Sequence, residues 1–343
     1  MTWRMTAALL LSLALALGTG PWLIRRLKKL HFGTVIYELG PAHQQKQGTP
    51  VMGGLMIALA VTVCQLLFHP RPWQGIWDTG LGLMGVSLLS MAVGFADDWI
   101  KAVRKRHEGL TPWQKIGGQV IVGLGFACWC YFNPQIGSRI RVPFLQTEWD
   151  LGLWYLPLMT LAVIFFVNST NLQDGLDGLL GTISVVSSSA WAMAALLDAL
   201  LLGYAAETAV PAGIFAVSLM GSCIGYLRYN RYPAKVFMGD TGSMFLGGAG
   251  IGLAMTMRQP LLLILIGLCP ILSSVSVILQ RYYFKLTRRF GKDHQGKRLF
   301  LMSPVHHHFE KKGYSETQIV SMYAGATAVA CMIAILSLLW GVG

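Results

Sequence analysis

Charge is scarce in this sequence. Asp, Glu, Lys and Arg together make up 12% of its 343 residues, whereas 54% of the residues are hydrophobic. A soluble domain needs a more highly charged surface around its core, so apolar segments on this scale must pack against lipid. The sequence also lacks tandem repeats, low-complexity tracts and any soluble domain. We therefore expect an all-α polytopic membrane protein in which residues 1–343 form one domain.

Missing features also exclude two other classes of protein. The six cysteines all lie inside apolar runs, where they behave as small hydrophobic residues, so we expect neither a disulfide framework nor a cysteine metal cluster. The net charge is +12, but no basic domain with interleaved aromatic residues supports nucleic-acid binding. We interpret the basic excess as a signal of membrane topology.

The apolar stretches and the basic residues together predict the topology. The first stretch resembles a secretory signal, but the basic residues at 25–29 follow it directly and favour a retained anchor. With the N-terminus outside, the inner loops hold twenty of the 27 lysines and arginines, as the positive-inside rule requires. Both termini are then external, with a small external hairpin expected within 133–151. Ten stretches are near the length that crosses a bilayer, at 6–24, 52–68, 80–96, 113–132, 152–169, 179–197, 208–227, 243–257, 260–284 and 318–341.

The ninth stretch contains Pro270 inside its apolar run. A proline there should kink the helix or open it towards lipid, because it removes a main-chain hydrogen bond. A bent helix leaves a groove beside it.

An unusual polar stretch, residues 168–178, ends the fifth apolar run. On a regular helix, side chains at every third position would spread over half of the circumference, so they can face one ligand only if the helix unwinds. The two glycines of the stretch allow such unwinding. Polar caps at a helix end are the simpler interpretation, but four polar groups at membrane depth favour a functional site. The four recurring residues are Asn168, Asn171, Asp174 and Asp177.

Five aspartates stand at the inner ends of apolar stretches under this topology. Adjacent carboxylates repel one another, so the pair at 97 and 98 implies a cation, a shared proton or a nearby lysine. Carboxylate and amide oxygens suit Mg²⁺, which binds through a few carboxylates together with phosphate oxygens. Three acidic clusters on one membrane face are thus expected to converge on one cavity. The five residues are Asp97, Asp98, Asp174, Asp177 and Asp240.

Basic residues and histidines accompany these aspartates. Basic runs at 101–106 and 228–235 are typical of inner-leaflet anchors, but beside carboxylates they indicate a polyphosphate bound with Mg²⁺. Three successive histidines, 306–308, follow Ser303-Pro304. Neighbouring side chains diverge and the HxxxH spacing is absent, so a zinc site is not expected. Imidazoles beside phosphate can instead donate hydrogen bonds or relay protons.

These motifs resemble those of the polyprenyl-phosphate N-acetylhexosamine-1-phosphate transferases along essentially the whole chain. The histidine block is similar to that of the muramoyl branch of this family. The resemblance implies Mg²⁺-dependent transfer of phospho-MurNAc-pentapeptide from UDP-MurNAc-pentapeptide to undecaprenyl phosphate, which gives lipid I and UMP for peptidoglycan synthesis. The motifs are Gly48-Thr-Pro-Val-Met-Gly-Gly, Phe95-Ala-Asp-Asp, Asn168 to Gly178, Phe237-Met-Gly-Asp-Thr-Gly-Ser and Ser303-Pro-Val-His-His-His-Phe-Glu.

The resemblance further implies a bacterial inner-membrane protein with ten spans and a cytoplasmic active-site cleft, and it leaves open a homodimer. It makes Asp97 the base for the lipid phosphate, with Asp98 beside it, and Asp240 a metal ligand. His306 is a further catalytic candidate. We favour the ligand role of Asp240 over a nucleophilic one, because a helix start stabilises a carboxylate. The nucleotide-sugar site would be lined by Lys46, Asn171, Asp174, Asp177, Asn230, Phe237, Gln280, His306 and His307.

Other functions remain open at this point. A cation-coupled transporter also carries carboxylates in its helices, but its sites usually lie near the membrane midplane. A sister transferase would use UDP-N-acetylglucosamine, and the sugar nucleotide that the purified protein accepts distinguishes the two. A purely structural membrane protein would not need five clustered aspartates.

Overall fold

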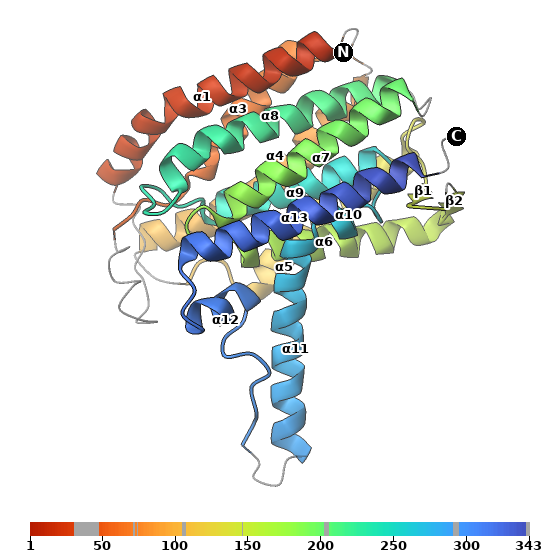
Figure 1. The fold of residues 1–343 in the computed structure, drawn as a ribbon. Coiled ribbons are helices and arrows are strands. Elements are labelled where there is room, and N and C mark those ends of the chain that lie inside the picture. The colour runs from red at the N-terminus through yellow and green to blue at the C-terminus, as the bar shows by residue number, and fades with distance from the viewer. Residues whose placement is uncertain are drawn as a thin grey trace.

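The protein is a bundle of helices in which two short strands form the described sheet (Figure 1). The computed structural model describes residues 1–30, 48–70, 73, 75–104, 108–145, 147–201, 206–290 and 295–340. Its elements are α1 (Thr2–Lys29), α3 (Gly54–Phe68), η1 (Gly75–Trp77), α4 (Thr79–Arg104), α5 (Pro112–Phe132), β1 (Arg139–Val142), β2 (Thr147–Asp150), η2 (Gly152–Trp154), α6 (Tyr155–Gln173), α7 (Leu179–Leu200), α8 (Ala206–Asn230), α9 (Gly239–Thr256), α10 (Leu263–Ile266), α11 (Leu268–Phe290), α12 (Val305–Lys311) and α13 (Glu316–Leu339).

The helices confirm the predicted class, an all-α polytopic membrane protein. Each of the ten apolar stretches coincides with one helix, except the ninth, which forms two. Within the described ranges, seven helices are long and apolar enough to cross a membrane. The exact number of spans therefore stays a prediction. The seven are α1, α4, α5, α6, α7, α8 and α13.

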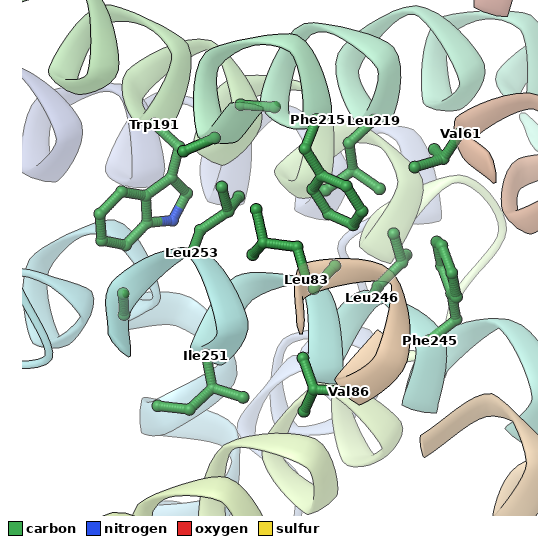
Figure 2. Packing of buried hydrophobic residues seen from close by; sticks show 14 of the residues in the cluster. Val61, Leu83, Val86, Trp191, Phe215, Leu219, Phe245, Leu246, Ile251 and Leu253 are labelled. Atoms are coloured by element: carbon green, nitrogen blue, oxygen red, sulfur yellow. The ribbon is translucent and has the colours of Figure 1, made fainter. Parts of the chain in front are cut away.

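Helix α9 lies at the centre of the bundle and faces almost no lipid. Nearly all of its side chains from Thr241 to Thr256 are buried, and it packs against α4 and α6. Its many glycines and alanines let neighbouring helices approach closely, as is typical of membrane bundles. Figure 2 shows large apolar side chains such as Trp191, Phe215 and Leu83 packed around α9. A central position explains why the eighth stretch is short and poor in large lipid-facing residues.

The predicted hairpin is present. Strands β1 and β2 pair antiparallel, with Arg139 opposite Asp150. The guanidinium of Arg141 donates to both oxygens of the buried Asp198, at 2.8 and 2.6 Å, and Arg258 pairs with Glu148 at 2.8 Å. The start of α1 and the end of α13 lie at this same end of the bundle (Figure 1). The shared end agrees with the predicted topology, although which face is cytoplasmic stays a prediction.

The ninth stretch breaks into α10 and α11. The expected interruption is present, but it lies at Gly267, and Pro270 falls in the first turn of α11. Proline is tolerated there, because the first main-chain N–H groups of a helix have no partner within it. Figure 1 shows α11 projecting away from the other helices. Its far half, from Arg281 to Phe290, is largely exposed and mixes aromatic with basic residues.

Candidate active site

Three of the five aspartates meet where α4 ends and α9 begins. One oxygen from each of Asp97, Asp98 and Asp240 lies within 4.8 Å of the others. Asp97 and Asp98 are buried, whereas the Asp240 side chain is 17% exposed. The two helices approach so closely because residue 94 is glycine: a Cβ there would collide with the main chain of Asp240. The predicted convergence is thus confirmed for these three carboxylates.

Both carboxylate oxygens of Asp98 accept hydrogen bonds from the start of α9. Its Oδ2 accepts hydrogen bonds from the main-chain N–H of Thr241 (2.8 Å) and from its hydroxyl (2.7 Å), and its Oδ1 accepts from the N–H of Asp240 (3.2 Å). A carboxylate is favoured at a helix N-terminus, where main-chain N–H groups have no intrahelical partner. Gly239 has a φ of +74°, and a Cβ there would collide with Asp98. Asp98 therefore positions Asp240.

Two lysines and an amide complete the cluster. Lys115 lies 2.9 Å and Lys101 3.2 Å from Oδ2 of Asp240, while the Asn171 amide donates to Oδ1 at 2.7 Å. Lys101 also pairs with Asp97, whose Oδ1 accepts from the main chain of Leu110 at 2.9 Å. The nearby lysines thus offset the repulsion between the carboxylates. A lysine was one of the three alternatives predicted from the adjacent aspartates, beside a cation and a shared proton.

Lys115 was missed by the sequence-based assignment of site residues. It is the one charged residue of the apolar stretch 113–132, so a signal was present. An ionisable residue inside a predicted span indicates a functional site by default. Lys101 was counted only as one member of a basic run.

The cluster lines a hollow of about 610 Å³ between α4, the segment 108–112 and α5. Its wall includes Asp97, Asp240, Lys101 and Lys115. Three carboxylates against two ammonium groups leave a net negative charge, and the donors are carboxylate and amide oxygens. This donor set fits a hard divalent cation.

The polar residues at the end of α6 and in the loop after it contact different partners. Asn168 still belongs to α6, where its amide donates to Gln119 of α5 at 2.7 Å. Asn171, one turn later, reaches Asp240. Asp177 is buried, and its Oδ2 accepts from the main chain of Ala234 at 2.9 Å.

The two glycines of this loop act differently. Gly178 has a φ of +76°, as the predicted unwinding requires. Gly175 is needed for space instead, since a Cβ there would meet the imidazole of His306. Asn230 joins the loop to α8, because its Oδ1 accepts from the N–H of Gly178 at 3.1 Å.

Asp174 is half-buried and carries an unusual pKa. Burial, and then the negative charges of Asp240, Asp98 and Asp177, raise the pKa of Asp174 to about 8. Its carboxyl group is therefore protonated in much of the protein at neutral pH and can donate as well as accept a hydrogen bond.

The histidine run diverges only in part, because the rings of His306 and His307 lie 4.4 Å apart and both face Gly175, whereas His308 contacts Leu301. His306 is buried against Gly175, and neither of its ring nitrogens has a hydrogen-bond partner among the described residues. Burial, and then the neighbouring His307, lower the pKa of His306 to about 3, so its imidazole is neutral. His307 contacts Glu310 at 2.9 Å, and His308 accepts from the main chain of Leu301 at 3.1 Å. Within the described ranges, no candidate metal cluster includes a histidine.

The other assigned residues are Phe237, Gln280 and Lys46. Phe237 is half-buried, and its main chain bonds to Pro50 and Gly53 at 2.8 Å each, which joins two of the sequence motifs. Gln280 faces a different hollow, beside α11. Lys46 lies outside the described residues.

A bundle of apolar helices with acidic and basic side chains gathered at one end defines an integral membrane protein with a charged polar site. The model of glycosyl transferase family 4 matches residues 81–258. The chain is 40% identical to phospho-N-acetylmuramoyl-pentapeptide-transferase of Heliobacterium modesticaldum over 97% of both chains. It is 41% identical to the protein of that name from Solidesulfovibrio magneticus, over 93% of this chain and 88% of that one, and 38% identical to the one from Clostridium perfringens, over 98% and 99%. The chain belongs to glycosyl transferase family 4 and, within it, to the family of phospho-N-acetylmuramoyl-pentapeptide-transferases.

Proposed function

We propose that the chain transfers phospho-MurNAc-pentapeptide from UDP-MurNAc-pentapeptide to undecaprenyl phosphate, producing lipid I and UMP for peptidoglycan synthesis. The reaction takes place at the cytoplasmic face of the bacterial inner membrane. The cluster of Asp97, Asp98 and Asp240 with two lysines carries this proposal, because it sits at helix ends where a lipid phosphate and a water-soluble nucleotide can meet.

Both reactants are anions, so the site must offset their repulsion. Lys101 and Lys115 supply two fixed positive charges in the wall of the hollow. Asp240 would hold Mg²⁺, and the hydrogen bonds of Asp98 to the start of α9 keep Asp240 in place. When bound, the cation offsets the phosphate charge and stabilises UMP as it leaves.

Asp97 is the base in this proposal. It takes the proton of the lipid phosphate, whose oxygen then forms a bond to the phosphorus that carries the sugar while the bond to UMP breaks. Asp240 is poorly suited to attack that phosphorus itself, because Asn171, Lys101 and Lys115 all contact its oxygens. These contacts support transfer in one step.

The loop after α6 serves the nucleotide. Asp174 offers a hydrogen-bond donor beside an acceptor, a pattern that complements an imide such as uracil. The half-buried Phe237 can stack on the base. His306 is neutral but fully buried against Gly175, so its ring nitrogens can contact the nucleotide only if the loop around Gly175 shifts on binding.

Release of UMP by purified protein with undecaprenyl phosphate and Mg²⁺ tests this function. We expect UMP from UDP-MurNAc-pentapeptide and almost none from UDP-N-acetylglucosamine. Asp240→Asn should abolish release, whereas Asp150→Asn, at an exposed carboxylate of the hairpin, should not. Preference for UDP-N-acetylglucosamine would instead identify the sister transferase.

A further inference from the structure

A second hollow, of about 700 Å³, lies between α11 and the segment 295–304. That segment runs back along α11 towards α12 (Figure 1). The described residues that line it include four cationic side chains and no acidic one. The four are Arg281, Lys285, Arg298 and Lys311.

These four cations differ from the lysines of the aspartate cluster. Within the described part of the chain, none of them pairs with a carboxylate, whereas Lys101 and Lys115 both contact Asp240. Like charges around one concave surface repel each other and concentrate anions there. The hollow therefore has the electrostatic character of an anion site.

The wall of the hollow is fixed by main-chain hydrogen bonds. The carboxamide of Gln280 accepts from the N–H groups of Leu299 (3.0 Å) and Phe300 (2.8 Å) and donates to the carbonyl of Phe300 (3.1 Å). These bonds fasten the segment that carries Arg298 to α11. Gln280, which the family resemblance assigned to the nucleotide sugar, here positions this basic wall.

Helix α12 connects the hollow to the aspartate site. At its start, the N–H of Val305 donates to Ser276 at 3.0 Å, and His306 lies against Gly175. At its end, Lys311 lines the hollow. Lys311 follows His306 by five residues of α12, a rise of about 7.5 Å, and Lys285 follows Ser276 by nine residues of α11, a rise of about 13.5 Å.

We propose that this hollow binds carboxylates of the peptide that the donor substrate carries. The inference rests on the proposed function, since only a peptide-bearing sugar nucleotide would reach both places. A pentapeptide ends in a carboxylate and extends up to about 17 Å, which is longer than the path along α12 from His306 to Lys311, so a peptide that begins beside His306 can reach these cations. Guanidinium groups such as those of Arg281 and Arg298 bind carboxylates through two parallel hydrogen bonds.

The test measures KM and kcat for two donors with the double variant Lys285→Glu/Arg298→Glu. For UDP-MurNAc-pentapeptide we expect KM to rise about tenfold, because two exposed attractions are replaced by repulsions, with kcat within about twofold. For UDP-MurNAc, which lacks the peptide, both parameters should stay within about twofold. The matched control is Lys297→Glu, an exposed lysine of the same segment whose side chain does not line the hollow.

A second donor, in which the C-terminal carboxylate of the peptide is blocked, tests directly whether this carboxylate is bound. A pentapeptide donor with an amidated C-terminus should bind the native enzyme more weakly than the free acid, and the double variant should lose or reverse this preference. Equal KM increases for both donors, or an unchanged KM for the pentapeptide donor, would overturn the proposal. The proposal would also be overturned if Lys297→Glu showed the same defect and if that defect depended on phosphatidylglycerol in the lipid vesicles that hold the enzyme. Such a result would assign the cations to lipid headgroups. No UMP release from UDP-MurNAc-pentapeptide by native protein would mark failure of the proposed function itself.

Discussion

Replacing Asp98 by asparagine tests whether this residue positions the site or takes part in the chemistry. Asparagine has the same shape but presents one NH₂ group in place of an oxygen. Oδ2 accepts two short bonds from Thr241, so the NH₂ group should take the place of Oδ1, which accepts only the 3.2 Å bond from Asp240. The variant then leaves the main-chain N–H of Asp240 without an acceptor.

The loss of stability in Asp98→Asn follows from the burial of this contact. A buried donor without a partner costs about 1–3 kcal/mol, and losing a negative charge at a partly buried helix N-terminus costs up to about 2 kcal/mol. We therefore expect Asp98→Asn to lower the free energy of unfolding by about 2–4 kcal/mol. The shift of Asp240 should reduce kcat by up to about a hundredfold.

Thermal unfolding of the purified protein, followed by tryptophan fluorescence at a fixed scan rate, measures the first effect, and UMP release measures the second. Asp97→Asn is the comparison, because it should lose activity with a smaller change in Tm. An Asp98→Asn protein with native Tm and no detectable activity would refute the positioning role and make Asp98 a catalytic residue.

Four further predictions concern Asp174, the membrane topology and the reaction path. The folded-state pKa of Asp174 is raised to about 8, so the native state binds more protons than the unfolded state between about pH 4 and 8. The Tm of the ligand-free protein should therefore fall as pH rises through this range. Asp174→Asn should flatten this dependence of Tm on pH. Asp174→Leu, which removes both hydrogen-bonding groups, should weaken UDP-sugar binding while Mg²⁺ dependence persists, whereas Asp174→Asn keeps a donor beside an acceptor and should weaken it little. A selective loss of metal affinity would contradict this role. Single cysteines at the exposed Glu108 and Thr147 should be labelled from opposite sides of the membrane, and labelling of both from outside would refute the topology. Without lipid acceptor, radiolabelled UMP should not enter UDP-MurNAc-pentapeptide; incorporation that is lost in Asp240→Asn but kept in Asp97→Asn would reveal a covalent intermediate.

The sequence was sufficient to predict the architecture, because hydropathy depends on local composition. Ten apolar stretches gave the helices, and the turn residues near Pro134 and Gly137 gave the hairpin. The break in the ninth stretch was expected from Pro270 but lies at Gly267, since proline fits a first helical turn better than a helix interior.

The site was predictable only in part. Asp97, Asp98 and Asp240 were expected together because each closes one apolar stretch on the same face. The partners of each carboxylate depend on how helices cross, which no spacing in the chain reveals. The three acceptor contacts of Asp98 could therefore not be distinguished from a catalytic role. Lys115 was missed for a different reason, because its charge inside an apolar stretch was a signal that was not used.

The contacts of the cluster also differ in when a growing chain can form them. Lys101 follows Asp97 by four residues on the same helix, so this ion pair is available as soon as α4 has formed. The donors to Asp98 come from residues 142 and 143 positions later in the chain. The contact that neutralises Asp97 thus lies within α4 itself, whereas the donors to Asp98 exist only when α9 is present. Docking of α9 supplies the missing donors and brings Asp240 to Lys101 in the same event, which couples the completion of the bundle to the assembly of the site.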